Sequence, residues 1–135
     1  MPATTTQLSQ TIQQGDWKSE KHVPIISSPD RVQANEIFPV TVTIGDEVSH
    51  PNTTVHHIRW IRLYFQEAEG KFPREVAQVE FNAHGESAEG ADQGPVYTHH
   101  GATTQLKLSQ SGTLFAEAYC NIHGLWQSSC DIQVD

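Results

Sequence analysis

The chain has 135 residues, enough for one domain with its own hydrophobic core. It carries 16 acidic side chains against 8 lysines and arginines, and the formal charge of -8 argues against a nucleic-acid-binding protein. No apolar run approaches the roughly 20 residues of a membrane span, which excludes a membrane-spanning helix.

The N-terminal segment is rich in Thr and Gln and predicts a flexible polar tail over residues 1–15, followed by a single domain over residues 16–135. The segment lacks the basic start and the apolar stretch of a signal peptide, so we expect a cytoplasmic protein. Residues 9–17 predict at most a short helix, because Gly15 and the polar composition disfavour one.

Strand patterns dominate the remainder of the chain. Residues 38–44 and 57–66 alternate apolar and polar side chains, as half-buried strands do. Further strands are expected over residues 75–83, 103–108, 113–119 and 131–134. Short strands separated by Gly, Pro, Asn and Ser predict an all-β fold, an antiparallel β-sandwich or barrel of about seven strands.

Cysteine and histidine are the unusual components of the sequence. Cys120 and Cys130 could form a disulfide, but in a reducing cytosol free thiols and metal thiolates are favoured. The 8 histidines exceed ordinary usage, and histidine is the commonest metal-ligating side chain. These two residue types together direct attention to a metal site.

Three short segments combine these residues at loop positions. Cys120 and His123 precede a glycine, so a tight turn at a strand end brings a thiolate and an imidazole together. His50 opens a loop that returns at His56, and His22 precedes Val-Pro, where the proline favours an extended chain. The joint occurrence predicts a mixed cysteine and histidine metal site.

The residues alone leave the metal open among zinc, copper and iron. Structural zinc usually takes more cysteine, and a blue-copper site wants an axial methionine, whereas the only methionine is Met1. Five candidate ligands with one open position favour iron. A copper electron carrier remains one alternative, and an immunoglobulin-like binding module with incidental histidines is another.

The motifs Glu-Lys-His-Val-Pro from Glu20, His-Pro-Asn-Thr-Thr-x-His-His-Ile from His50 and Cys-Asn-x-His-Gly-Leu-Trp from Cys120 resemble the superoxide reductases of the one-iron, neelaredoxin type. These are relatives of desulfoferrodoxin, whose second iron centre needs cysteines that are absent before Cys120. The resemblance implies an immunoglobulin-like sandwich, and reduction of superoxide to hydrogen peroxide at one mononuclear non-haem iron.

The resemblance also implies roles for individual residues. Glu20 and Lys21 match a mobile pair beside an open sixth position, where Lys21 would attract superoxide and Glu20 would bind the ferric ion after product release. The implied equatorial ligands are His22, His50, His56 and His123, and the implied axial ligand is the Cys120 thiolate. An external electron donor such as rubredoxin and a homotetramer are expected as well.

Other conspicuous residues are expected to lie outside this ligand set. His57 follows His56 on a probable strand, where neighbouring side chains point to opposite faces, so His57 should not share its metal. Trp60 and Trp126 are expected to pack around the ligands, and Asn121 is a candidate for orienting one by hydrogen bonding. Surface or interface positions are expected for His84, His99 and His100.

Overall fold

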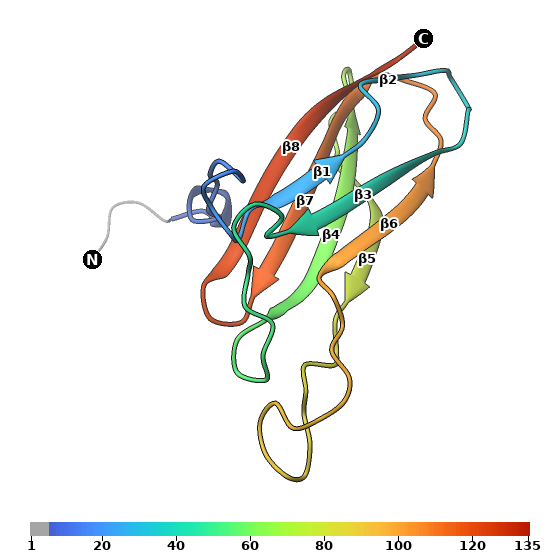
Figure 1. The fold of residues 1–135 in the computed structure, drawn as a ribbon. Coiled ribbons are helices and arrows are strands. Elements are labelled where there is room, and N and C mark those ends of the chain that lie inside the picture. The colour runs from blue at the N-terminus through green and yellow to red at the C-terminus, as the bar shows by residue number, and fades with distance from the viewer. Residues whose placement is uncertain (1–5) are drawn as a thin grey trace.

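The computed structural model describes residues 6–135, and nearly all of its regular structure is β-strand (Figure 1). Where at most a short helix was predicted, over residues 9–17, the structure has one 3-10 turn, η1 (Leu8–Gln10). The strands are β1 (Pro24–Ser27), β2 (Arg31–Val32), β3 (Phe38–Ile44), β4 (Ile58–Glu67), β5 (Arg74–Glu80), β6 (Gly101–Leu106), β7 (Gly112–Cys120) and β8 (Gly124–Val134).

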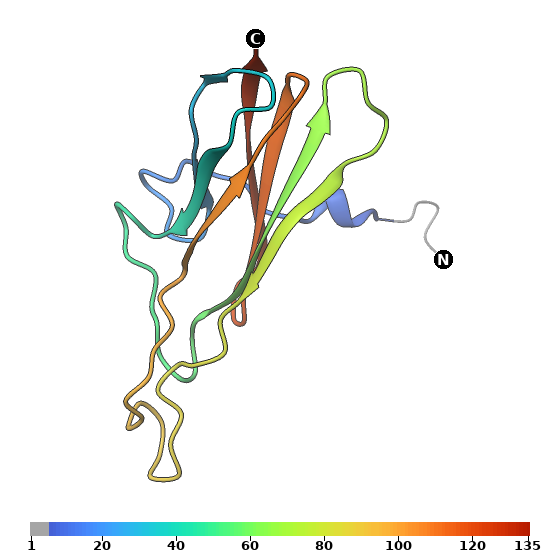
Figure 2. The same cartoon turned by 90° about the vertical axis from the view of Figure 1, so that its right-hand side faces the viewer.

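The strands form two sheets that face each other, as the two perpendicular views show (Figures 1 and 2). One sheet has the order β1-β3-β6 and the other the order β2-β8-β7-β4-β5. The pairings are antiparallel, except that the two-residue strand β2 runs parallel to β8. The predicted all-β, immunoglobulin-like antiparallel sandwich is therefore confirmed.

Alternation along β3 and β7 builds the core between the sheets. Val40, Val42 and Ile44 are at most 3% exposed, while the threonines between them face outward. The same period along β7 buries every second residue, from Gly112 to Cys120 at its end. The thiol of Cys120 thus lies inside the molecule where the core ends.

The strand predictions differ from the structure at several places, and the strand predicted over residues 75–83 ends at Glu80. The segments β1 and β2 had not been predicted, and β8 begins at Gly124, whereas the sequence pattern predicted a strand over residues 131–134 only. The first half of β8 is rich in Ser and Gln, so it lacks the apolar alternation that marks a strand. Backbone pairing with β7 along its whole length holds it in place instead.

The expected tail over residues 1–15 lies partly outside the described residues. Within the described part, Gln13 forms a parallel bridge with Trp126, and its backbone bonds Leu125 and Gln127. The division of the chain into a tail and one domain at residue 15 stays a prediction. No helix in residues 6–135 is long and apolar enough to cross a membrane.

Strand register brings the ligand-bearing segments to one end of the sandwich. Pro24 at the start of β1 pairs with Ile44 at the end of β3, and Cys120 at the end of β7 pairs with both Ile58 and Gly124. The segment before β1, the loop between β3 and β4 and the turn between β7 and β8 therefore meet there (Figures 1 and 2).

Candidate metal centre

Four imidazole rings form a closed cycle at this end of the sandwich. Their centroids lie 4.8 Å apart for His22 and His50, and 4.9 Å apart for His50 and His56. The other two sides are 5.0 Å between His56 and His123, and 4.8 Å between His123 and His22. Because the four sides are nearly equal, His22 lies opposite His56 and His50 lies opposite His123.

The Cys120 thiol joins this cycle. One donor atom from each of His22, His56, Cys120 and His123 lies within 4.8 Å of all the others. Donors on opposite sides of a metal with bonds of about 2.1 Å lie about 4.2 Å apart, so this spread matches one shared ion. His50 completes the four-sided arrangement through its ring contacts with His22 and His56.

Hydrogen bonds at Nδ1 fix the tautomers of two of these histidines, and the Nε2 of His22 lies 3.1 Å from Nδ1 of His123 within the cycle. His50 donates its Nδ1–H to the Pro51 carbonyl oxygen at 2.6 Å, and His22 donates its Nδ1–H to Glu20 Oε1 at 2.6 Å. Each bond leaves the lone pair on Nε2. The Nε2 atoms of His50 and His56 are buried and have no hydrogen-bond partner within residues 6–135, which is the environment a metal ion would satisfy.

Burial keeps these imidazoles neutral, as metal binding requires. It lowers the pKa of His50 to about 4, although the bond to Pro51 opposes the shift. Burial also lowers the pKa of His56, assisted by the charges of His123 and Lys21. For His22 burial again lowers the pKa, while Glu20 counteracts part of the effect.

The turn between β7 and β8 holds the thiol and the fourth ring together. The His123 backbone N–H donates to Cys120 Sγ at 3.3 Å, which stabilises a thiolate. Gly124 has a φ of 83°, a conformation that closes the turn and that glycine adopts without strain. Trp126 donates its Nε1–H to the His123 carbonyl at 3.2 Å and stacks on His22 with centroids 4.7 Å apart.

Glu20 and Lys21 lie beside the cycle. Glu20 Oε1 accepts both the Nδ1–H and the backbone N–H of His22, the latter at 2.9 Å, so its carboxylate sits behind that ring. Partial burial raises the pKa of Glu20, but these bonds outweigh it and the net pKa lies below its usual value. The half-exposed Lys21 contributes to the lowered pKa of both His22 and His56, which occupy opposite corners of the cycle.

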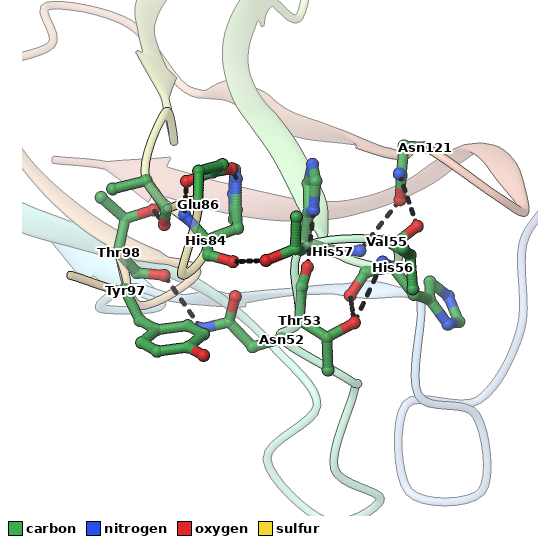
Figure 3. A network of polar contacts seen from close by, with 12 residues as sticks. Asn52, Thr53, Val55, His56, His57, His84, Glu86, Tyr97, Thr98 and Asn121 are labelled. Atoms are coloured by element: carbon green, nitrogen blue, oxygen red, sulfur yellow. Dashed lines mark hydrogen bonds and ion pairs between the residues drawn. The ribbon is translucent and has the colours of Figure 1, made fainter. Parts of the chain in front are cut away.

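The remaining histidines lie outside the cycle. His57 points to the other side of the chain from His56 (Figure 3) and stacks on His84. The expected surface position is found for His99, whereas His84 and His100 are buried, at 3% and 6% exposed. His100 approaches His50 edge-on, with centroids 5.8 Å apart.

Other residues around the site depart from the expectations or extend them. Trp126 packs on a ring of the cycle as expected, but Trp60 stacks on Tyr119 at the outer face of the sheet, with Arg62 over its ring. Sequence reasoning missed Gln13, whose side-chain amide donates to the His123 carbonyl at 3.1 Å. No motif marks that glutamine, because only the folded β8 edge brings it there.

The arrangement suits a transition metal that accepts imidazole and thiolate. Imidazole binds iron, copper and zinc, and a thiolate adds one soft, electron-donating ligand. The four-sided cycle offers more nitrogen donors than a blue-copper site uses, and structural zinc sites are usually tetrahedral. The residues present, four imidazoles and one thiol, therefore fit a non-haem iron.

Comparison with known proteins shows which family the chain belongs to. Residues 14–129 match the family described as desulfoferrodoxin. The neelaredoxin of Megalodesulfovibrio gigas is 58% identical over 87% of this chain and 90% of its own length. The superoxide reductase of Pyrococcus furiosus is 47% identical over 93% of this chain and 99% of its own.

A solved structure is also similar along almost the whole chain. The superoxide reductase (neelaredoxin) of Archaeoglobus fulgidus in the reduced form superposes with a TM-score of 0.84 at 46% identity, covering 90% of this chain and 98% of that one. Family match, sequence identity and structural similarity extend over the same segments that build the candidate metal centre. The chain belongs to the desulfoferrodoxin family.

Proposed function

We propose that this protein is a superoxide reductase, an oxidoreductase that converts superoxide to hydrogen peroxide with one electron and two protons. The observation that carries the proposal is the closed cycle of His22, His50, His56 and His123 with the Cys120 thiol against it. Relatives named superoxide reductase and neelaredoxin, similar over their whole lengths, support the same activity.

The proposed cofactor is one mononuclear non-haem iron per chain, held by the four histidines and Cys120. When bound, iron would supply the single electron by cycling between its ferrous and ferric states. The protein residues do the rest: burial lowers the pKa of His22, His50 and His56 and so favours their neutral form, and the His123 N–H donates to the Cys120 sulfur. The Cys120 thiolate would donate electron density to the iron, as a thiolate does in haem proteins.

Lys21 provides positive charge at the site, which the net negative charge of the protein makes necessary. A formal charge of -8 repels superoxide, which is itself an anion, so the site needs local positive charge. The charge of Lys21 contributes to the lowered pKa of both His22 and His56, which supports a position near both rings. We assign to Lys21 the attraction of superoxide and the stabilisation of the charge that develops on the product.

We assign two positions to the Glu20 carboxylate. In one, it orients His22 by accepting from Nδ1–H, as the second partner of a ligating histidine commonly does. In the other, it would bind the ferric ion once the product has been released. Glu20 lies two residues before His22, and its carboxylate is bonded to that ring. A small movement of the Glu20 side chain would therefore suffice to exchange the two positions.

The activity is tested by metal analysis and rapid mixing. We expect one iron per chain, and we expect the ferrous protein to be oxidised at second order in superoxide while hydrogen peroxide is formed. One copper per chain would favour the electron-carrier alternative. Iron that superoxide leaves unoxidised would favour a binding module, and release of dioxygen with peroxide would reveal dismutation instead of reduction.

A small redox protein such as rubredoxin is proposed as the electron donor. His123 is exposed, and the apolar side chains of Val55 and Ile122, exposed by 67% and 57%, lie on the adjacent loops. Such a surface suits a small, transient electron-transfer contact. Ile122→Asp should slow reduction of the ferric protein by rubredoxin, whereas Ile37→Asp, at a side chain also 67% exposed, is the matched control.

Assembly and location are proposed on separate grounds. A homotetramer is supported by the outer face of the larger sheet, which carries Trp60, Arg62 and Tyr64. Tryptophan, tyrosine and arginine are the residue types most enriched at the energetically dominant positions of protein interfaces. Light scattering after size exclusion tests it. A cytoplasmic location is supported by the free thiols of Cys120 and Cys130, which a reducing compartment maintains.

A further inference from the structure

Asn121 makes three hydrogen bonds to one short segment of the ligand loop, the loop between β3 and β4 that carries His50 and His56. Its side-chain Oδ1 accepts the backbone N–H of His57 at 2.9 Å, and its Nδ2 donates to the Val55 carbonyl at 3.0 Å. Its own backbone N–H donates to the His57 carbonyl at 3.2 Å. Figure 3 shows the side chain of Asn121 facing the Val55–His57 backbone, with His56 between the two bonded residues.

This side-chain amide adds two hydrogen bonds at the end of the strand ladder, where the backbone contributes only the bond from the Asn121 N–H to the His57 carbonyl. The β4–β7 pairing ends at Ile58 and Cys120, and its register shifts between Ile58 and Trp60. Beyond that point the side chain of Asn121 supplements the backbone, because an amide offers the same donor and acceptor as a peptide group. The bonds therefore join the segment carrying His56 to the turn carrying Cys120.

The ligand loop has a separate set of bonds that maintain only its own shape. The His56 N–H donates to Thr53 Oγ1 at 3.1 Å, and the Thr53 N–H donates to the His56 carbonyl at 2.9 Å. These contacts close a turn within the loop. They do not set its distance from the β7–β8 turn, which Asn121 spans.

We propose that Asn121 is a positioning residue that sets the separation between His56 and the Cys120–His123 turn, and thereby the metal affinity of the site. The inference rests on the proposed metal centre. The His56–His123 side of the ring cycle, 5.0 Å between centroids, is the dimension that Asn121 controls. A small change there moves two donors that must reach one ion.

Cobalt(II) titrated into the metal-free full chain tests the proposal, with Asn121→Ala, Asn121→Asp and Tyr64→Phe beside the wild type. Asn121→Ala should raise the Kd for cobalt about 10- to 100-fold and shift the thiolate-to-cobalt absorption band. Asn121→Asp retains an acceptor for the His57 N–H but loses the donor to Val55. Its Kd for cobalt should therefore lie between that of the wild type and that of Asn121→Ala. Tyr64→Phe removes the Tyr64–Glu117 bond of 2.8 Å in the same strand pair and should leave Kd within about twofold.

Each other outcome counts against the proposal. Cobalt affinity and spectrum of Asn121→Ala within about twofold of the wild type would overturn it. An equal loss in Tyr64→Phe would reduce the effect to general stability and overturn it too. If Asn121→Ala does not fold, the cobalt Kd of Asn121→Asp is compared with that of Tyr64→Phe, and the same criteria apply. A wild type without thiolate absorption would instead remove the proposed metal centre, a failure visible before any variant is compared.

Discussion

The imidazole ring of His57 lies parallel to that of His84, with an interplanar angle of 6° and centroids 3.4 Å apart. Both side chains are buried, at 5% and 3% exposed. His57 also donates its Nδ1–H to the Thr53 carbonyl at 2.9 Å. The pair therefore supports the ligand loop from the side opposite to His56, as packing and not as ligation.

We expect His84→Ala to lower the free energy of unfolding by about 1–3 kcal/mol, because it removes a buried ring from a stack. Metal content should stay at one ion per chain, since His84 faces away from the cycle. Urea unfolding and metal analysis measure the two quantities. His99→Ala, at an exposed ring, is the control and should change neither. Loss of metal in His84→Ala at full stability would contradict the assignment.

Lys21→Ala should slow the second-order oxidation of the ferrous protein by superoxide about tenfold at low ionic strength. The rate should also become less sensitive to salt, because a steering charge is lost. Rapid mixing at several ionic strengths measures both effects. Lys18→Ala removes an exposed lysine that lies over the Trp17 ring and should leave the rate near that of the wild type. An unchanged rate in Lys21→Ala would refute the steering role.

Variants of Glu20 separate its two proposed positions. Glu20→Gln keeps an oxygen for the His22 Nδ1–H, whereas Glu20→Ala does not. Cobalt affinity should therefore fall about tenfold or more in the alanine variant and less in the glutamine variant. Both variants should change the ferric absorption spectrum while superoxide oxidation stays fast. An unaltered ferric spectrum would exclude Glu20 as the sixth ligand, and equal cobalt affinities would exclude its orienting role.

The two cysteines provide a matched pair. Cys120→Ser should abolish the thiolate-to-iron absorption and weaken metal binding, because a hydroxyl is a poor substitute for a soft thiolate. Cys130 lies on β8 with its Sγ 3.9 Å from Oγ of Ser28, which follows the end of β1, and burial raises the pKa of the Cys130 thiol. Cys130→Ser should therefore leave the absorption spectrum intact. Loss of the band in Cys130→Ser would contradict the ligand assignment.

Acid should destabilise the metal-free protein through His100. Burial first, and the His99 charge second, lower the pKa of His100 to about 4 from 6.5. The unfolded chain then binds more protons between these two values, so stability decreases as pH falls from about 6.5 toward 4. This lowered pKa of His100 corresponds to at most about 3–4 kcal/mol of stability, and solvent screening reduces that value.

Urea unfolding of the metal-free protein at pH 7, 5.5 and 4.5 measures this acid sensitivity. His100→Phe, which fills a similar volume without titrating, should lose less stability over that range than the wild type. Parallel curves for the two proteins would show that His100 does not contribute. Omission of metal matters here, because a bound ion would keep the neighbouring His50 from titrating as well.

Particular residues show how far the sequence predicts this structure. Threonines alternating with Val40 and Val42 define β3 unambiguously. The predicted opposite directions of His56 and His57 are found, although both residues precede β4 and the strand expected to hold them begins at Ile58. The start of β8 at Gly124 does not follow, because its pairing is a property of the neighbouring strand. The Glu20–His22 bond and the His57–His84 stack also depend on backbone paths that no local pattern encodes.

The ligand positions are more predictable than the contacts that support them. Cys120, His123 and the His50–His56 loop can be recognised from residue type and spacing, and the structure brings them together. Gln13 and Asn121 are ordinary polar residues whose importance lies in where they point. The candidate ligands can therefore be recognised in the sequence by their residue types, whereas the residues that support them can be recognised only in the folded structure.

The ring cycle has a consequence for how the protein matures. Its members come from segments about a hundred residues apart, as the contact between His22 and His123 illustrates. The donors converge only after both sheets have paired, so the ion should be captured by a sandwich that has already folded. Divalent zinc and copper compete well for nitrogen and sulfur donors. The identity of the loaded metal would then be decided by which ion the cell supplies at that moment, and correct delivery becomes part of making an active molecule.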